Sequence, residues 1–177
     1  MKILNYKIHS GFTLVELLVV VAIVGLLSAV AIAAFSSSRV SSRDAKRQKD
    51  IKAIQTALEA YYSVYNRYPL SVAWSSSSND LGRWDTLQNA LRPYLAGLPV
   101  DPAQSETGTP LTGPSSYSYA YRSLNTNVDC YRNAYVLIYR LENPTGPDPG
   151  VVQCNGVYLQ YGTGVKSALQ TLGNKAK

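Results

Sequence analysis

The sequence has 177 residues, with two cysteines, one histidine and a formal net charge of +6. Two cysteines are too few to hold a zinc ion without histidine, and the single histidine, His9, lies in the short segment before the apolar run. We therefore predict no metal site, no cofactor and no histidine-dependent enzyme. The length fits one domain, and the mild positive surplus does not require nucleic acid as a partner.

Residues 1–11 form a short basic segment that is followed at once by an apolar run over 12–35. A secretory signal peptide carries its apolar region before its cleavage site, whereas here the small residues Ser10 and Gly11 precede the apolar run. Cleavage after Gly11 would therefore leave the apolar segment on the mature protein.

The apolar run is long enough to cross a membrane. From Leu17 to Phe35 there are 19 uncharged, mostly apolar residues. At about 1.5 Å of rise each, they come close to spanning a bilayer core of about 30 Å. A buried helix of a soluble domain is the alternative, but it would be expected to show a polar stripe. We predict a transmembrane or assembly helix over residues 12–38.

Glu16 is an acidic residue in this apolar setting, where a charge costs about 2.5 to 3.5 kcal/mol at the centre of a membrane helix and less near an end. One interpretation is a capping box, in which Thr13 caps the helix and Glu16 bonds back to it. The other is that cleavage frees an amine on Phe12, whose charge Glu16 neutralises in a neighbouring subunit. Both interpretations stay open at this point.

Residues 7–18, KIHSGFTLVELL, resemble the prepilin signature of the type IV pilin and type II secretion pseudopilin superfamily: a glycine, then a phenylalanine, with a glutamate four places on. The resemblance implies that a prepilin peptidase cuts between Gly11 and Phe12 and that the new amine of Phe12 is methylated. It also implies that Glu16 guides assembly by pairing with the Phe12 amine of an adjacent subunit.

The same resemblance implies the partners and the location of the chain. The partners would be identical or related pilin subunits in a homopolymer, the prepilin peptidase, the inner-membrane assembly machinery and membrane lipid. Before assembly the chain would be a single-pass membrane protein with its carboxy-terminal domain outside the cytoplasm. After assembly it would be part of an extracytoplasmic filament.

An amphipathic continuation of the helix is predicted over residues 39–68. Its apolar residues recur at spacings of three and four, which places them on one face, and charged residues occupy the other faces. The helix is expected to end at Tyr68, because the residue before Pro69 avoids the helical conformation. The apolar residues are Ile51, Ile54, Leu58, Tyr61 and Tyr65, and the charged ones are Arg43, Lys46, Arg47, Lys49, Asp50, Lys52 and Glu59.

The basic cluster from Arg39 to Lys52 has two interpretations: a solvated helix face, or a patch that binds nucleic acid or lipid headgroups. Aromatic residues are not interleaved with these charges, and no recognised nucleic-acid motif accompanies them. These features favour the solvated face.

Residues 69–177 are predicted to form a connecting loop and a carboxy-terminal antiparallel sheet domain. The loop, 69–116, is rich in Ser, Pro, Gly and Asn and contains one short helical pattern, Trp84 to Leu95. Strand patterns follow, and the tail after residue 167 is predicted to be frayed. The strand patterns are SYSYAYRSL over 116–124, NAYVLIYRLE over 133–142 and VVQCNGVYLQYG over 151–162.

The expected fold class is α+β, with the long helix packed on a small antiparallel sheet as in pilins. Packing the sheet on the amphipathic face is the simplest way to bury the apolar residues of both together. Alternating tyrosines in the strand patterns are expected to pack across strands. The residues expected to share this core are Ile54, Leu58, Tyr61, Val136 and Ile138, and the alternating tyrosines are Tyr117, Tyr119, Tyr121, Tyr135 and Tyr139.

Cys130 and Cys154 belong to the part that the resemblance places in an oxidising space. A disulfide closing a loop of about 25 residues is one interpretation, and two separate buried thiols are the other. The residues beyond 70 look more distantly like major pseudopilins of type II secretion, which carry a carboxy-terminal calcium site built on acidic ligands. The nearest acids are Asp129, Glu142 and Asp148; no ligand motif matches, and we assign no calcium.

The leading prediction is a structural filament subunit, either of a type IV pilus or of a type II secretion pseudopilus. The alternative is a competence-type pseudopilin or membrane-anchored module that binds DNA or another anionic partner. A membrane-tethered enzyme is disfavoured, because no histidine follows His9 and no clustered carboxylate motif is present.

Overall fold

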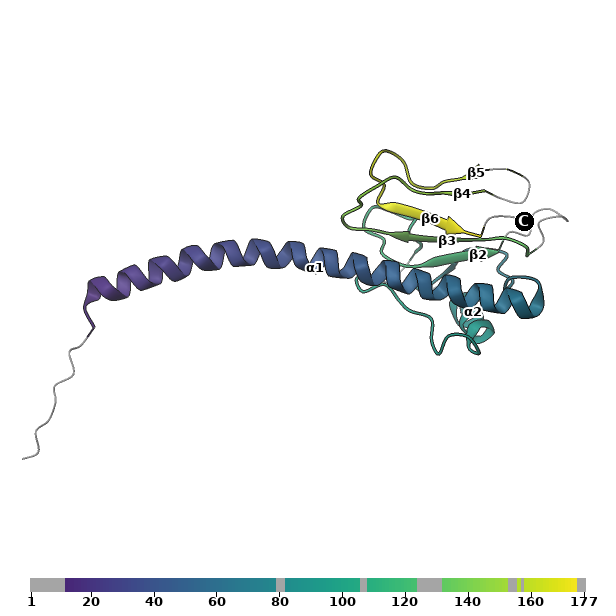
Figure 1. Cartoon of the computed structure of the whole chain (residues 1–177), viewed down its shortest axis with the longest axis horizontal. Helices are drawn as coiled ribbons and strands as arrows, with labels where there is room; N and C mark the ends of the chain where they lie inside the picture. The colour runs from purple at the N-terminus through teal and green to yellow at the C-terminus, as the bar shows by residue number, and fades with distance from the viewer. Residues whose placement is uncertain are drawn as a thin grey trace, which may run out of the picture. The chain divides into compact units, whose positions relative to one another are not determined.

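The computed structural model describes residues 12–78, 82–105, 108–123, 132–152, 156 and 158–174, with the backbone alone over 31–34. The chain divides into two compact units, Met1–Arg39 and Val40–Lys177. Helix α1, Leu14–Tyr65, contributes residues to both units (Figure 1).

Helix α1 ends at Tyr65, before the predicted stop at Tyr68. Asn66 adopts the left-handed conformation with φ 49°, and its N–H donates to the Tyr62 carbonyl at 2.7 Å. A left-handed asparagine is a common way to close a helix, because its short side chain tolerates this backbone conformation. The prediction overlooked this signal and relied on Pro69 instead.

The second unit contains a four-stranded antiparallel sheet in the order β1-β2-β3-β6 and a two-stranded sheet, β4-β5 (Figure 1). The predicted α+β fold, with a long helix and a small antiparallel sheet, is confirmed. The strands are β1 Ser75–Ser76, β2 Ala120–Ser123, β3 Tyr135–Arg140, β4 Val151–Val152, β5 Tyr158–Leu159 and β6 Leu169–Gly173, and the second helix is α2 Arg83–Leu91.

The carboxy-terminal strands differ from the prediction. The segment predicted as one strand over 151–162 contributes the short pair β4 and β5 instead. The tail predicted to fray contains β6, which pairs with β3 from Arg140↔Leu169 to Val136↔Gly173. Strand β3 is buried along its whole length, so both of its edges need hydrogen-bonding partners, and β2 and β6 supply them.

The sheet buries both of its faces, which corrects the expected core. Tyr135, Leu137 and Tyr139 pack in one cluster with Ile54 and Leu58 of α1. The alternate β3 residues belong to a second cluster, because successive strand side chains point to opposite faces. That cluster contains Ala120, Ala134, Val136, Ile138 and Val151, with Trp74, Leu111, Leu159 and Tyr161 packed against it.

The prediction for α2 holds in its packing. Trp84, Leu87 and Leu91 are buried at helical spacing, and Leu95 packs against the same core just after the helix. The predicted cross-strand packing of tyrosines is also observed, since the rings of Tyr121 and Tyr135 lie 6.1 Å apart between β2 and β3.

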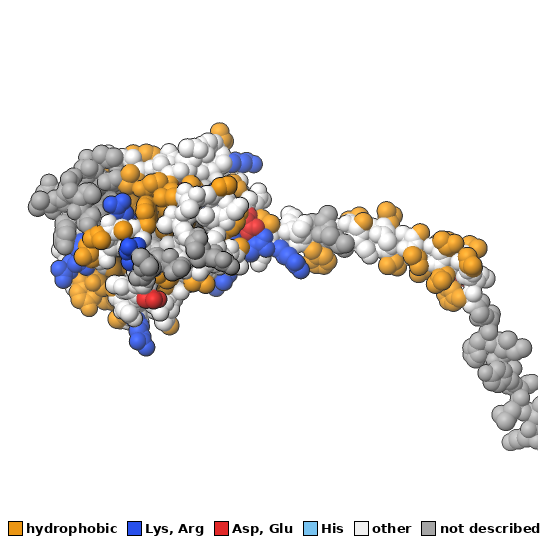
Figure 2. Space-filling model, turned by 180° about the vertical axis from the view of Figure 1, so that it is seen from behind, with side chains coloured by type: hydrophobic (Ala, Val, Ile, Leu, Met, Phe, Trp, Pro, Cys, Tyr) orange, Lys and Arg blue, Asp and Glu red, His pale blue; other side chains and the backbone are white. Residues whose placement is uncertain are grey.

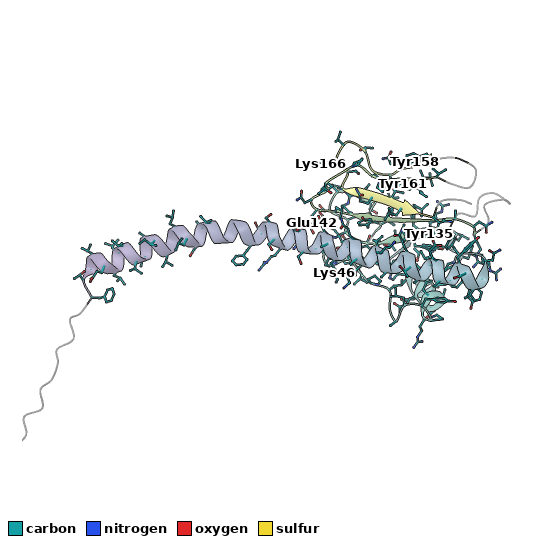
Figure 3. The ribbon with its side chains drawn as sticks, viewed as in Figure 1. Lys46, Tyr135, Glu142, Tyr158, Tyr161 and Lys166 are labelled. Carbon is teal, nitrogen blue, oxygen red and sulfur yellow. The ribbon has the colours of Figure 1, made fainter. Side chains whose placement is uncertain are left out.

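Arg47 of α1 is fully buried in a cluster of charged side chains. Its guanidinium binds Asp101 through two hydrogen bonds, Nε to Oδ2 at 2.8 Å and Nη2 to Oδ1 at 2.9 Å. Nη1 donates to Asp44 and to Glu142, each at 2.6 Å. Arg43 donates to the same Glu142, which lies beside α1 (Figure 3).

This cluster corrects the prediction of one solvated basic face over residues 39–52. Arg47 is fully buried and the Arg43 side chain is only one-third exposed. Lys46, Lys49 and Lys52 remain exposed on the helix. Periodicity along the helix indicates an outward position for each of these charges, because it contains no information about distant acids such as Asp101 and Glu142, which bind Arg47 in the folded chain.

Candidate assembly segment

The residues around Glu16 form a reciprocal capping box. The Thr13 N–H and hydroxyl donate to Glu16 Oε2 at 2.9 and 2.8 Å, and the Glu16 N–H donates to Thr13 Oγ1 at 3.2 Å. These bonds satisfy backbone N–H groups that have no partner inside the first turn of a helix. The capping interpretation of Glu16 therefore corresponds to a contact in the structure.

Capping does not use the whole carboxylate. Within the described part of the chain, the hydrogen bonds to the Glu16 side chain all end on Oε2. Glu16 is exposed, so Oε1 is open to a cation from another molecule. The two interpretations of Glu16 are therefore compatible, because one oxygen can cap the helix while the other binds an amine.

The first half of α1 exposes apolar side chains on all sides. Phe12 exposes 80% of its surface and no large apolar residue from Leu14 to Leu27 exposes less than 49%. Figure 2 shows hydrophobic side chains gathered along this segment. Apolar surface of this extent needs a covering, either lipid or other helices. Among the described residues, α1 is the one helix long and apolar enough to cross a membrane.

Two small residues interrupt the apolar surface at its middle. The Ser28 hydroxyl donates to the Val24 carbonyl at 2.7 Å, which satisfies its polar group inside the helix. Gly25 lies one turn away, and a Cβ placed on it would meet nothing within 4 Å. Small residues of this kind let a second helix approach closely.

Several predicted site residues lie outside the described residues: Gly11 of the cleavage site, and Cys130 and Cys154 of the disulfide candidate. Phe12 and Glu16 are described: Phe12 lies two residues before α1, and Glu16 lies in its first turn. Within the described ranges, no group of three or more His, Cys, Asp or Glu side chains could hold a metal ion.

Comparison with known proteins first identifies the amino-terminal segment. Residues 7–32 match the family model of the prokaryotic N-terminal methylation motif. The chain is 38% identical over 74 residues to a type IV major pilin protein, PilA, of Myxococcus xanthus, a match that covers 42% of this chain and 31% of the relative. It is 37% identical over 61 residues to type II secretion system core protein G of Aeromonas hydrophila, covering 34% of this chain and 43% of the relative.

A longer match comes from type II secretion system core protein G of Pseudomonas aeruginosa, 33% identical over 101 residues, covering 53% of this chain and 68% of the relative. The chain belongs to the type IV pilin and type II secretion pseudopilin superfamily. This confirms the resemblance found in residues 7–18. The matches span less than half of the first two relatives, and no solved structure matches significantly.

The relatives found by the comparisons are structural pilin and pseudopilin proteins and not enzymes. The methylation motif and the apolar helix fit a membrane-anchored pilin. The exposed carboxylate of Glu16 lies within the matched motif. The start of α1 is therefore the candidate functional site of this chain.

Proposed function

We propose that this pilin-type chain is a structural subunit of a type IV pilus or a type II secretion pseudopilus. It is inserted in the membrane as a prepilin, cleaved after Gly11, methylated on Phe12 and polymerised by packing of its first helix. The observation that carries this proposal is a carboxylate, Glu16, with one open oxygen at the start of an apolar helical segment whose large side chains are exposed.

The chemistry of assembly follows from this arrangement. Packing the apolar helices of several subunits together covers their exposed side chains without a membrane. A carboxylate buried among them is unfavourable unless a cation pairs with it. Cleavage before Phe12 creates such a cation four residues away along the chain, and the amine of an adjacent subunit can reach the open oxygen of Glu16. Pairing then removes both unfavourable charges and sets the register between neighbouring helices.

The partners follow from the same proposal. They are copies of this chain or related pilin subunits, a prepilin peptidase, the inner-membrane assembly machinery and membrane lipid. The methylation motif and the relatives support this set. The carboxy-terminal unit is proposed to lie outside the cytoplasm, in the membrane-anchored form and in the filament.

Variants of Glu16 and Thr13 separate assembly from capping. Glutamine also serves in a capping box, so Glu16→Gln keeps the helix start and removes the charge. Thr13→Ala removes the cap and keeps the charge. We expect cells with Glu16→Gln or Glu16→Ala to hold normal amounts of the membrane protein but to lose filaments, and cells with Thr13→Ala to keep them. Membrane immunoblots and electron microscopy of sheared filaments measure the two quantities.

Filaments at the wild-type level in Glu16→Gln would remove the role proposed for this charge. Loss of filaments in Thr13→Ala alone would instead assign the segment a purely local, helix-starting role. Asp85→Asn is a matched control, since it removes one exposed carboxylate outside the assembly segment.

The alternative of a DNA-binding module has less support. Arg43 and Arg47 of the basic cluster bind acids of the same chain, which leaves Arg39, Lys46, Lys49 and Lys52 exposed on α1. Salt-sensitive binding of DNA to the purified protein, lost on substitution of these lysines, would favour the alternative.

A further inference from the structure

Asp148 is a buried carboxylate that accepts hydrogen bonds from several segments of the carboxy-terminal region. Its Oδ1 accepts from the Gly150 N–H at 3.1 Å and from the Thr171 N–H, and its Oδ2 accepts from the Tyr161 and Gly162 N–H groups at 3.1 and 2.7 Å. The Thr171 hydroxyl also donates to Oδ2. The side chain is almost completely buried, with 2% of the residue exposed.

The glycines beside Asp148 make this arrangement sterically feasible. A Cβ on Gly162 would collide with the Asp148 side chain and with Ser167. Gly150 has φ 62°, and a Cβ there would collide with the hydroxyl end of Tyr158. Backbone N–H groups that converge in this way form a concave binding site for an anion. Here the anion is a side chain of the protein itself.

Asp148 also protects the free edge of β6. Thr171 lies opposite Ile138 of β3, yet its N–H donates to Asp148 and not to β3. Tyr161, which carries one of the donors, lies in the segment that follows β5 (Figure 3). The carboxylate therefore joins this segment to β6 and occupies an edge N–H that another strand could otherwise bind.

These contacts conflict with the calcium site that the resemblance to major pseudopilins implies. A carboxylate has about four lone-pair positions, and the donors around Asp148 fill them. Calcium needs about six to eight oxygen ligands. The other described candidate, Glu142, is bound to Arg43 and Arg47 in a separate cluster. Asp129 lies outside the described residues.

We infer that the carboxy-terminal region is organised without calcium, and that the Asp148 carboxylate is the hydrogen-bonding centre that takes the place of a metal ion. The residues around it do not fit a calcium site, because the groups that contact the carboxylate are four backbone N–H donors and one donating hydroxyl, and they occupy the oxygens that would bind a metal ion. The organising charge is supplied by the chain, so the fold of this region does not depend on the calcium concentration outside the cell.

Thermal unfolding of the full-length chain in detergent micelles tests the inference. We expect the wild-type Tm in millimolar CaCl2 to agree with that in EDTA within about 1 °C, and Asp148→Asn to lower it by about 5 to 10 °C in both. Thr171→Val removes the hydroxyl, which donates to Asp148 and accepts from the Tyr161 N–H, and should lower Tm by about 2 to 5 °C, which keeps the test decisive if Asp148→Asn does not fold. Asp85→Asn, an exposed acid of α2, is the control.

Each other outcome overturns the inference. A calcium-dependent rise in wild-type Tm that Asp148→Asn lacks would make Asp148 a metal ligand. A rise in both proteins would show that a calcium site elsewhere stabilises the region. If Asp148→Asn and Thr171→Val both unfold at the wild-type Tm, the Asp148 carboxylate does not stabilise the carboxy-terminal region.

Discussion

The Glu142 carboxylate lies between two arginines of α1 and binds both of them. Hydrogen bonds from Arg43, reinforced by those from Arg47, favour its charged form and lower the pKa of Glu142 from 4.5 to about 2. Partial burial acts in the opposite direction but is outweighed. The folded state therefore holds this group ionised at pH values where the unfolded chain would already bind a proton.

Because the pKa is lower in the folded state, Glu142 stabilises the fold fully above about pH 4.5, and this contribution is lost as the pH falls toward 2. We expect the free energy of unfolding of the wild type to decrease across this interval more steeply than that of Glu142→Gln. Urea unfolding at a series of pH values measures both slopes. Asp85→Asn should keep the wild-type slope, and equal slopes for wild type and Glu142→Gln would contradict the assigned pKa.

Arg47 shows why single residues are hard to place from sequence. Its spacing from Arg43 and from the neighbouring lysines is typical of a solvated face. Its burial depends on Asp101 and Glu142, which are distant in sequence, and on the Tyr117 ring, whose centroid lies 4.6 Å from the guanidinium carbon. A buried cation of this kind is stable only when all of its partners are present.

Strand β3 determines how the elements of the second unit pack. Its alternate side chains enter two separate clusters, one with α1 and one beneath the loop that carries Leu111 and the segment around β4 and β5. The sequence pattern of 133–142 is almost continuously apolar, which is typical of a strand covered on both faces. The expectation of one shared core with α1 misassigned Val136 and Ile138, because a single register step moves a side chain to the other face.

Substitutions on the two faces of β3 test this arrangement. Leu137→Ala on the α1 face and Ile138→Ala on the opposite face should each lower the free energy of unfolding by about 2 to 5 kcal/mol, because each leaves a cavity in a closed core. Val152→Ala, at a side chain that is 46% exposed, should change it by less than about 0.5 kcal/mol. Chemical unfolding in detergent measures all three. A negligible effect of Ile138→Ala would show that the second face is open.

At the scale of the whole molecule, the chain combines two units that differ in how much apolar surface they expose. The described part of Met1–Arg39 exposes its apolar side chains, whereas the described residues of Val40–Lys177 bury most of theirs in two clusters. The first unit therefore needs a covering from outside the chain and the second does not. This division is what a subunit requires if it is stored in a membrane and later transferred to a polymer.

The proposed processing predicts a specific covalent state. Protein recovered from membranes of producing cells should lack residues 1–11 and carry a methyl group on the Phe12 amine. Intact mass and amino-terminal sequencing measure both features, and the same cells without prepilin peptidase should yield the uncut chain. An uncut chain in cells that hold an active peptidase would leave the membrane-anchored binding module as the better explanation.

The prepilin segment could be predicted from sequence because its signal is local. The order of the basic leader, the small residues, the apolar run and Glu16 is a linear pattern, and the match over residues 7–32 agrees with it. The helix α2 and the strands β2 and β3 were predicted for the same reason, since periodicity within a segment reveals them. Strands β1 and β6 were missed, because Ser75–Ser76 and Leu169–Gly173 have weak patterns and become strands only by pairing with β2 and β3.

The sequence by itself determined the superfamily, the long helix and the α+β class, because each depends on composition and spacing along the chain. The tertiary structure alone decided which side chains meet: the burial of Arg47, the two faces of β3 and the hydrogen bonds that surround Asp148. These contacts join residues that are far apart in sequence. Their energies depend on distance and exclusion of water, which a linear pattern does not contain.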